Sequence, residues 1–513
     1  MNITPTNTTL SDFYDIVAPD AGAMIETLRA FGYHLETSIA DIIDNSVFAG
    51  AHNIWIDCTW AGEMSTIAIR DDGCGMSEEV LKNAMRPGSK NPLQDRDSKD
   101  LGRFGLGLKT ASFSQCRKLT VGSKSEGNGI AIRSWDLDYV NECGEWRLIR
   151  PNKENIHPVF SILDHQKCGT IVLWEKIDRM IKGTDINDEK HQNHFFEQLD
   201  ILKSHLAMVF HRFLEKPNGL KIFLNEKEVK PWDPFLRNHP STQHLPPEYI
   251  IYCGKKINIR PFVLPHRSKL DDRTYELSGG PGGWNERQGF YVYRNERLIV
   301  PGDWLGLVFR KGQTIRKEQF TKLARIMVDI PNSFDGDWKI DVKKSVARPP
   351  NRIKDKFQRI SRLTIEQAIS VYRYRGKVSE RNNDPSFSFP WSTSVHHGMY
   401  HYSINREHPL VSDILRNSGN ARKKIQAMLR IIEETVPVPL IILNDSTNPD
   451  KIQRPFEDVP PAELKSVLEE IWKSLIESGI PNADAKKRLH HMEPFSDFPD
   501  FVDNFILNQT GDN

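Results

Sequence analysis

The sequence predicts an α+β protein of about three domains, and three observations support this prediction. The chain has 513 residues, whereas one domain usually contains ~100–200. Residues 21–175 show short alternating strand patterns with hairpin turns, flanked by helical patterns, which is typical of an α/β sandwich with a mixed, mainly antiparallel sheet. A second α/β pattern follows, and the last part of the chain is mostly helical in periodicity.

The composition excludes several classes of protein. Hydrophobic residues make up 38% of the chain and charged residues 27%, so it can build cores and is neither fibrous nor broadly disordered. The formal net charge of +1 argues against a protein that is basic along its whole length, although it leaves room for a local basic face. The apolar runs are shorter than the ~20 residues of a membrane span, and we see no secretory signal, so we expect a cytoplasmic protein without membrane contact. The six cysteines form no C-x-x-C pair, and we expect buried free thiols.

The expected boundaries divide the chain into four segments. Residues 1–20 would be a loose leader, 21–190 the first α/β domain, 191–350 the second α/β domain, and 351–513 a mostly helical C-terminal region without an assigned role.

The first domain should begin with a helix over residues 21–48. Apolar residues recur there at helical spacing, and Gly50 then ends the pattern. Alternation predicts a strand hairpin at 54–58 and 66–70, and Ser77 can cap a helix at 78–85. Further strands are expected at 118–124, 129–137, 146–149 and 169–174.

The later elements are expected from the same patterns. The second domain should contain a helix at 197–215, a Gly-rich loop at 278–283, and strands near 220–224, 291–293 and 324–329. The C-terminal region should contain helices at 352–374, 410–434 and 461–479, with a buried strand at 435–443.

Four motifs in the first domain could carry chemistry. Asp41 and Asn45 lie four residues apart on the expected helix, about 40° around its axis, so both side chains point the same way. An acid beside a carboxamide suits water activation and Mg²⁺ ligation, and the alternative is an ordinary solvated helix face. The second motif, Asp71-x-Gly73-x-Gly75, ends a strand, where an aspartate can accept a hydrogen bond from an amine and glycines allow close approach of the backbone.

The third and fourth motifs are a glycine cluster and a strand start. Gly102-x-x-Gly105-x-Gly107 follows the polar loop 86–103 and precedes a helix, where free N–H groups can bind phosphate. It fits neither a Walker A loop, because Leu108 separates Gly107 from Lys109, nor the Gly-x-Gly-x-x-Gly of a Rossmann fold. Gly169-Thr170 opens an apolar strand and by itself indicates only a turn.

Together these motifs resemble the GHKL ATPases, a superfamily that includes the gyrase B subunit, MutL, the ninety-kilodalton heat-shock chaperone, histidine kinases and the Microrchidia (MORC) proteins. SIADIIDNSVFAGA is similar to the N-box helix of that family, RDDGCGM to its adenine box, LGRFGLGLKTAS to its glycine box and GTIVLW to its closing threonine strand. The resemblance covers residues 20–350 and is closest to bacterial MORC-like and MutL-like ATPases. It implies the Bergerat α/β sandwich, followed by a βαβ-type transducer domain.

The resemblance also implies roles for single residues. Asp71 would bind the adenine amine, with Gly73, Gly75, Met76 and Thr170 around the base. Asn45 would be the metal ligand, holding Mg²⁺ against the phosphates of ATP. Residues 86–103 would form a lid over the nucleotide. The phosphate contacts would come from Gly102, Gly105, Gly107 and Lys109.

Asp41 departs from the family, whose hydrolytic members usually have glutamate at this position. The aspartate side chain is one methylene shorter, so its carboxylate could lie about 1 Å short of the attacking water, which would cost about 10²-fold in rate. We therefore expect Asp41 to be catalytic and Mg²⁺-dependent ATP hydrolysis to be slow.

The second domain strengthens the resemblance. GFYVYRNERLI, at 289–299, is similar to a strand-turn-strand of the transducer domain, and DWKIDVKKS, at 337–345, to the segment whose lysine reaches the γ-phosphate. Lys343 is the expected second catalytic residue, with Lys339 and Lys344 as competitors, and a solvated basic face is the alternative. A cation there would distinguish ATP from ADP.

Charge is unevenly distributed despite the neutral total. Residues 310–362 hold fifteen Lys/Arg and six Asp/Glu, whereas 439–513 hold seven and fourteen. The basic segment could contact DNA phosphates, or it could be ordinary surface that pairs with the acidic tail within a dimer.

The expected function is an ATPase that forms a homodimer on ATP binding and acts as a clamp on DNA. The resemblance suggests bacterial restriction or phage defence as the setting. The main alternative is a nucleotide-switched protein that binds ATP, dimerises and recruits an effector protein with little hydrolysis. A chaperone would need client binding in the C-terminal region, and a histidine kinase would normally carry its phospho-acceptor bundle before the ATPase domain.

Overall fold

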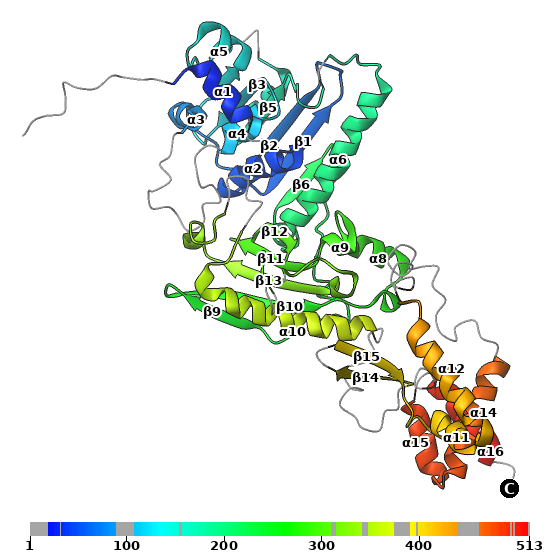
Figure 1. Ribbon diagram of the computed structural model, residues 1–513. Helices are drawn as coiled ribbons and strands as arrows, with labels where there is room; N and C mark the ends of the chain where they lie inside the picture. Colours follow the sequence, from blue (N-terminus) through cyan, green and yellow to red (C-terminus); the bar gives the residue numbers. More distant parts are fainter. Residues whose placement is uncertain are drawn as a thin grey trace, which may run out of the picture. The chain divides into compact units, whose positions relative to one another are not determined.

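The computed structural model (Figure 1) describes residues 19–510 except 31, 89–106, 153–155, 182, 309–313, 341–346, 374–389, 397–398, 439–440, 442–460, 493–494 and 496–497. Two compact units are present, Met1–Gly376 and Lys377–Asn513.

The first unit begins with two helices where the sequence predicted one. α1 spans Ala21–Arg29 and α2 spans Leu35–Phe48. The break has a physical cause, because Gly32 adopts φ +64°, which a continuing helix cannot accommodate. The Arg29 side chain is buried at the end of α1 and donates hydrogen bonds to the carbonyls of Phe113 (2.8 Å) and Cys116 (3.0 Å).

A seven-stranded sheet forms the first layer, in the order β4-β3-β5-β2-β1-β6-β7. All neighbouring strands are antiparallel except β1 and β6, which are parallel, so the mixed, mainly antiparallel sheet predicted from the sequence is confirmed. The strands are β1 Asn53–Thr59, β2 Thr66–Asp71, β3 Lys118–Lys124, β4 Ala131–Asp136, β5 Gly169–Glu175, β6 Lys221–Leu224 and β7 Lys227–Glu228. The strand expected at 146–149 does not form, and only Ile149 makes an isolated bridge, to Ser134.

Helices cover one face of this sheet (Figure 1). They are α1, α2, α3 Glu78–Met85, α4 Gly107–Phe113, α5 Leu137–Cys143 and α6 Glu189–Val209, the last followed by α7 His211–Leu214. Ser77 caps α3 as predicted, because its side chain accepts a hydrogen bond from the Val80 N–H. The other face of the sheet packs on the 3₁₀ helix Pro158–His165 through Phe160, whose ring leaves no room for a side chain at Gly122.

The second sheet has the order β12-β11-β13-β10-β8, with β9 paired to β10. Its strands are β8 Gln243–His244, β9 Glu248–Tyr252, β10 Lys255–Val263, β11 Gly289–Arg294, β12 Arg297–Asp303 and β13 Ala324–Ile330, with α8 Asp272–Gly279 and α9 Gly283–Glu286 between β10 and β11. Short 3₁₀ helices lie at Arg267–Lys269, Gln319–Thr321, Asn332–Phe334 and Asn351–Ile353.

The domain boundaries in the structure differ from those expected. β6 and β7 belong to the first sheet, which therefore extends to Glu228 rather than ending before residue 191. At the other end, α10 (Lys354–Arg373) packs on β10 and β13, so this helix belongs to the second sheet rather than to the C-terminal region.

The second unit is mostly helical, as predicted. It contains α11 Pro409–Asn417, α12 Arg422–Thr435, α14 Pro461–Glu477, α15 Asn482–His490 and α16 Pro499–Thr510, and an unpredicted hairpin, β14 Trp391–His396 and β15 Met399–Ile404. The buried strand expected at 435–443 is wrong where this segment is described. Val438 and Ile441 are both 50% exposed and lie outside any strand.

All six cysteines are free, but only Cys58 and Cys116 are buried, so the expectation of six buried thiols is wrong. Burial raises the pKa of both thiols, which makes them poor nucleophiles. Among the described residues, none of the helices is long and apolar enough to cross a bilayer.

The Gly-rich segment at 278–283, which was expected to be a loop, comprises the end of α8, a short turn and the start of α9, and it lies beside the buried Arg325. Arg325 is fully buried, and its guanidinium carbon lies 5.4–5.8 Å from the ring centres of Trp232, Trp284 and Tyr291. It donates hydrogen bonds to the carbonyls of Pro234 and Ser278. Gly280 adopts φ +67°, and a Cβ there would lie 2.3 Å from the Trp232 ring, so glycine is required for this packing.

We predict that Arg325→Met destabilises the protein by about 2–4 kcal/mol, because two buried carbonyls lose their donor. Urea unfolding followed by tryptophan fluorescence measures this change. The exposed Arg316, replaced in the same way, is the control and should change the free energy of unfolding by less than about 0.5 kcal/mol. Equal effects at the two positions would show that the aromatic cage contributes nothing specific.

Candidate functional site

The motifs found in the sequence converge on one side of the first sheet. They lie on the second half of α2, at the end of β2 and the turn after it, at the first residue of α4, and at the first residues of β5. Gly102, Gly105, Lys343 and Lys344 lie outside the described residues, as does most of the proposed lid. Nine of the expected site residues can therefore be placed.

Asp41 is buried on α2 and faces the start of α4. Its Oδ2 atom accepts a hydrogen bond from the Tyr33 hydroxyl at 3.0 Å. The same oxygen lies 3.9 Å from the position that a Cβ would take at Gly107. Gly107 thus brings the backbone of the glycine motif next to the candidate catalytic carboxylate. Sequence reasoning missed Tyr33, which precedes α2 and lies eight positions before Asp41, outside the motif that contains Asp41.

Asn45 lies one helical turn after Asp41 and is exposed. Its Nδ2 atom donates to the main-chain carbonyl of Asp41 at 3.1 Å, which fixes the orientation of the carboxamide. The amide oxygen of such a side chain is a suitable ligand for Mg²⁺, which commonly takes few protein ligands and completes its shell with water and phosphate. In the described part of the chain, no group of three or more His, Cys, Asp or Glu residues could hold a metal by itself.

Asp71 ends β2 in a buried position, where its carboxylate accepts several hydrogen bonds. Its Oδ2 accepts from the Ser46 hydroxyl at 2.7 Å, and its Oδ1 from the Gly73 N–H at 3.0 Å. Burial raises the pKa of the Asp71 carboxyl, while the hydrogen bonds from Ser46, Gly73 and Thr170 oppose that rise. The Ser46 contact joins α2 to the end of β2, and Ser46 is recognisable only in hindsight as the residue after Asn45.

Gly73 and Gly75 are required by the protein's own packing. Gly75 adopts φ +65°, and a Cβ there would lie 1.9 Å from the carbonyl oxygen of Lys124. A Cβ at Gly73 would lie 2.9 Å from that of Ala49. Both glycines are therefore needed for packing within the protein, and their expected role beside the adenine base stays a prediction.

Thr170 and Met76 are linked by a residue that the sequence analysis did not identify. The Ser123 hydroxyl lies 2.9 Å from the Thr170 hydroxyl and accepts a hydrogen bond from the Met76 N–H at 2.8 Å. Thr170 on β5 pairs with Ser123 on β3 and with Asp71 on β2. Strand register therefore places Asp71, Thr170 and Ser123 side by side, and only the paired sheet reveals this.

Lys109 is placed differently from its expected role at a phosphate. The side chain is 2% exposed, and its ammonium donates to the Ala84 carbonyl at 2.8 Å. Ala84 lies in the last turn of α3, where a cation complements the helix dipole. This contact ties α4 to α3, so the phosphate contact of Lys109 stays a prediction. Lys339 is exposed and adopts φ +50°.

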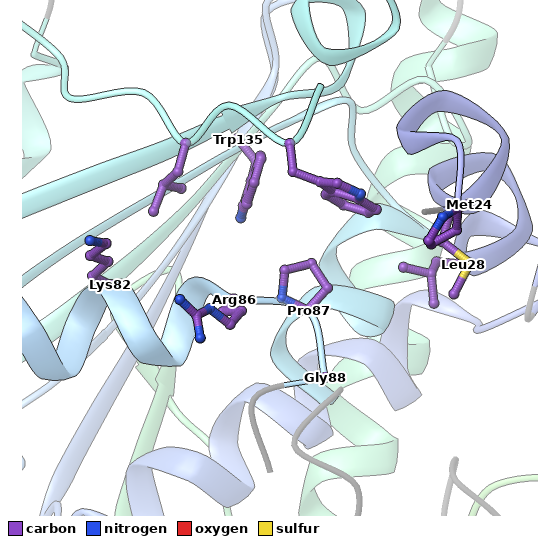
Figure 2. A pocket seen from close by; sticks show the side chains of 10 residues that line it. Met24, Leu28, Lys82, Arg86, Pro87, Gly88 and Trp135 are labelled. Atoms are coloured by element: carbon purple, nitrogen blue, oxygen red, sulfur yellow. The ribbon is translucent and has the colours of Figure 1, made fainter. Parts of the chain in front are cut away.

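A separate apolar pocket of about 580 Å³ lies beside α1 and the end of α3, and Figure 2 shows its lining. Trp135 forms part of its wall and is fixed there, because its Nε1 donates to the Met85 carbonyl at 3.0 Å. The lining residues are Pro19, Met24, Leu28, Lys82, Arg86, Pro87, Gly88, Trp135, Trp146 and Leu148. Arg86, Pro87 and Gly88 begin the segment 86–103 that is proposed as the lid, whereas none of the lining residues is among the candidate site residues on α2, β2, α4 and β5.

Comparison with known proteins gives matches to the same region. Residues 33–170 match the family of histidine kinase-, DNA gyrase B- and HSP90-like ATPases. The ATPase morc-1 of Caenorhabditis elegans is 32% identical over 91 residues, which cover 18% of this chain and 10% of that protein. The DNA mismatch repair protein MutL of Haemophilus influenzae is 35% identical over 92 residues, 17% of this chain and 14% of MutL.

A second mismatch repair protein gives a similar result. MutL of Paramagnetospirillum magneticum is 29% identical over 102 residues, which cover 20% of this chain and 16% of that protein. The chain thus spans only about a tenth to a sixth of the length of the curated relatives it matches. The matched region contains Asp41 and Asn45 on α2, Gly107 at the start of α4, and Asp71 and Thr170 on the mixed sheet. Residues 33–170 therefore form an ATPase domain of the GHKL superfamily, MORC-like and MutL-like in sequence.

Proposed function

We propose that the chain binds ATP at the site formed by α2, β2, α4 and β5, and hydrolyses it slowly with Mg²⁺. The observation that carries this proposal is the hydrogen bond from Ser46 to Asp71. It holds the helix with the candidate general base against the strand with the candidate adenine-binding carboxylate. One rigid arrangement can thus bind the base and present a carboxylate to the phosphate end.

In this proposal, the sheet residues hold the base and the helix residues act at the phosphates. Asp71 accepts from the adenine amine, with Met76 and Thr170 beside the base. Asn45 would hold Mg²⁺, which would supply charge neutralisation at the phosphates. The start of α4 at Gly107 offers N–H groups to a phosphate oxygen.

Asp41 is the proposed general base, and Tyr33 fixes its orientation. The Tyr33 hydroxyl bonds the carboxylate oxygen that lies nearer to Gly107, so the carboxylate is held toward the phosphate end. The side chain is short and buried, which limits its reach to a water molecule and supports slow turnover.

The biological role we propose is an ATP-gated dimeric clamp on DNA. ATP would order the lid, the ordered lid would complete a dimer surface, and Lys343 would sense the γ-phosphate. The similarity to a DNA mismatch repair protein supports a DNA partner. A role in bacterial phage defence rests on the resemblance to MORC-like proteins alone.

The basic segment at 310–362 offers fewer cations for DNA than its sequence suggested. Arg325 and Lys322 are buried, and Lys317 and Arg359 form ion pairs with Glu286 and Glu248. In the described part of this segment, the exposed cations outside any ion pair are Arg316, Lys339, Arg348, Arg352 and Lys356. Arg352, in the 3₁₀ helix that precedes α10, and Lys356, in the first turn of α10, are two neighbouring candidates for a phosphate contact.

The second candidate is a nucleotide-switched protein that recruits an effector with little hydrolysis. The burial of Asp41 and its bond to Tyr33 favour it, because a carboxylate held this way has little freedom to reach water.

Asp41→Asn should lower ATP turnover by about 10²-fold or more, because a neutral amide cannot act as a general base. Binding of a non-hydrolysable ATP analogue, measured by calorimetry, should stay within about threefold, since the amide keeps the acceptor for Tyr33. Asp71→Asn is the matched carboxylate replacement and should weaken binding of the analogue instead. Unchanged turnover in folded Asp41→Asn would remove Asp41 from the mechanism.

Light scattering coupled to size-exclusion chromatography should show a dimer with the non-hydrolysable analogue and a monomer with ADP or without nucleotide. The physical reason is that only the γ-phosphate would order the lid and complete the dimer surface. A monomer under all three conditions would exclude the gated clamp. A dimer together with undetectable turnover would support the effector-recruiting alternative.

DNA should stimulate turnover, and the double variant Arg352→Glu/Lys356→Glu should reduce this stimulation at least about fivefold, since two phosphate contacts are replaced by repulsion. The control is Lys190→Glu/Lys203→Glu, the same charge change at two exposed positions of α6. Equal loss in both double variants would indicate a general effect of net charge. Full stimulation in the α10 variant would place DNA elsewhere.

A further inference from the structure

A buried ion pair joins the ATPase domain to the second sheet. The Arg297 Nε atom on β12 lies 2.9 Å from the Asp44 Oδ1 atom on α2, and the two side chains are 4% and 2% exposed. These residues are 253 positions apart in the sequence. Arg297 also donates to the Leu298 carbonyl at 2.7 Å, and its guanidinium carbon lies 4.8 Å from the ring centre of Phe210.

An ion pair buried in this position restricts the arrangement of α2 and β12 more than it stabilises the fold. The cost of removing two charges from water commonly offsets their attraction, so a buried pair is weak evidence for stabilisation. Loss of one partner is costly, however, because the other charge stays buried without compensation. The pair therefore favours one arrangement of α2 relative to β12 over alternatives that would separate the two charges.

Asp44 occupies a sensitive place on α2. It follows Asp41 by three residues and immediately precedes Asn45, so a shift or rotation of α2 at Asp44 moves both candidate phosphate-end residues. The candidate adenine-binding residues, by contrast, are Asp71 and Thr170, which are paired in the sheet. A change at Asp44 should therefore affect the rate of hydrolysis more strongly than the binding of the adenine base.

Arg297 is held equally firmly on the second sheet. It directly follows a two-residue turn in which Asn295 and Glu296 adopt φ +48° and +66°, which fixes the register of β11 and β12. On the other side of this turn, Arg294 forms a second ion pair, with 2.8 Å between its Nε atom and Asp335 Oδ1. Asp335 belongs to the segment after β13 that leads toward residue 340. One short turn thus connects α2 with this segment.

A neighbouring contact supplies a natural comparison. Arg212 on α7 pairs with Asp329 on β13, and its guanidinium carbon lies 3.5 Å from the Tyr293 ring centre. His211 lies beside it, with 2.8 Å between its Nε2 atom and the Tyr293 hydroxyl. Arg212 therefore contributes to the same interface between the two sheets, and in the described part of the chain it makes no hydrogen bond or ion pair with α2.

We propose that Arg297 is a positioning residue for ATP hydrolysis, which acts through Asp44 by setting the position of α2. The second sheet and the turn at 295–296 thereby control how Asp41 and Asn45 are presented. This inference rests on the proposed ATPase function, and it adds a route by which the second sheet affects the rate of hydrolysis without contacting the nucleotide.

The test compares steady-state ATPase kinetics of the full chain and its variants. Arg297→Met should lower kcat about tenfold or more, with KM and analogue binding within about threefold, since small misplacements of catalytic groups are costly. Arg297→Lys keeps the charge and should retain intermediate activity. Arg212→Met is the matched control, which should loosen the same interface yet keep kcat within about threefold.

A double variant separates positioning from stability. Asp44→Asn/Arg297→Met leaves no buried charge unpaired, so thermal stability should recover relative to Arg297→Met. If Arg297 positions α2, kcat stays low in the double variant. Recovery of kcat together with stability would overturn the proposal, as would an equal loss of kcat in Arg212→Met.

Hydrogen exchange provides a readout that is independent of turnover. In the wild-type chain, the non-hydrolysable analogue should slow exchange both at Thr66–Asp71 and at Arg297–Asp303. In Arg297→Met, slowing should persist at Thr66–Asp71 and be lost at Arg297–Asp303. Absence of wild-type turnover would refute the proposed hydrolysis alone. Slowing at Arg297–Asp303 that persists in Arg297→Met, or is absent from the wild type, would overturn the coupling.

Discussion

The second sheet must bury both of its faces, and this requirement joins the two α/β layers into one unit. Side chains alternate along β11, so Phe290 and Val292 pack with α10, whereas Tyr291 and Tyr293 enter the core that also contains α2 and α6. α10 covers only one face, and the other face would be exposed without the first domain. The helix α6 therefore packs against both sheets. A division of the chain at residue 190 would expose part of this shared core to solvent.

This shared core determines the electrostatics at the junction. Burial and the nearby Arg297 and Arg287 lower the pKa of His205 to about 3, and burial also lowers the pKa of His211. Both histidines are therefore neutral at pH 7, and acidification below the ordinary histidine pKa favours unfolding over charging them in place. Because these histidines are neutral, neither of them carries a positive charge that could replace Arg297 as the partner of Asp44.

The sequence predicted the parts of this structure that depend on local pattern. Strand alternation predicted β1, β2, β3 and β5 to within one residue at each end, whereas the roles given to the motif residues stay predictions. Contacts made by pairing distant strands could not be read in this way. Ser123 lies next to Thr170 only through strand register, and Arg297 meets Asp44 across 253 positions. The hydrogen bond from the Lys109 ammonium to the Ala84 carbonyl at the end of α3 was likewise not predictable from the motif, and the phosphate contact of Lys109 stays a prediction.

The short side chain of Asp41 makes the position of its carboxylate depend on the contacts between α2 and the second sheet. A glutamate has an additional rotatable bond with which to reach a water molecule, so it tolerates small errors in the position of its helix. Asp41 lacks that bond, and Tyr33 further restricts its carboxylate. The position of the carboxylate is therefore set almost entirely by the position of α2. In the proposed mechanism, an aspartate at position 41 would both slow hydrolysis and make its rate depend more on the contacts that hold α2 in place, of which the buried Asp44–Arg297 pair is one.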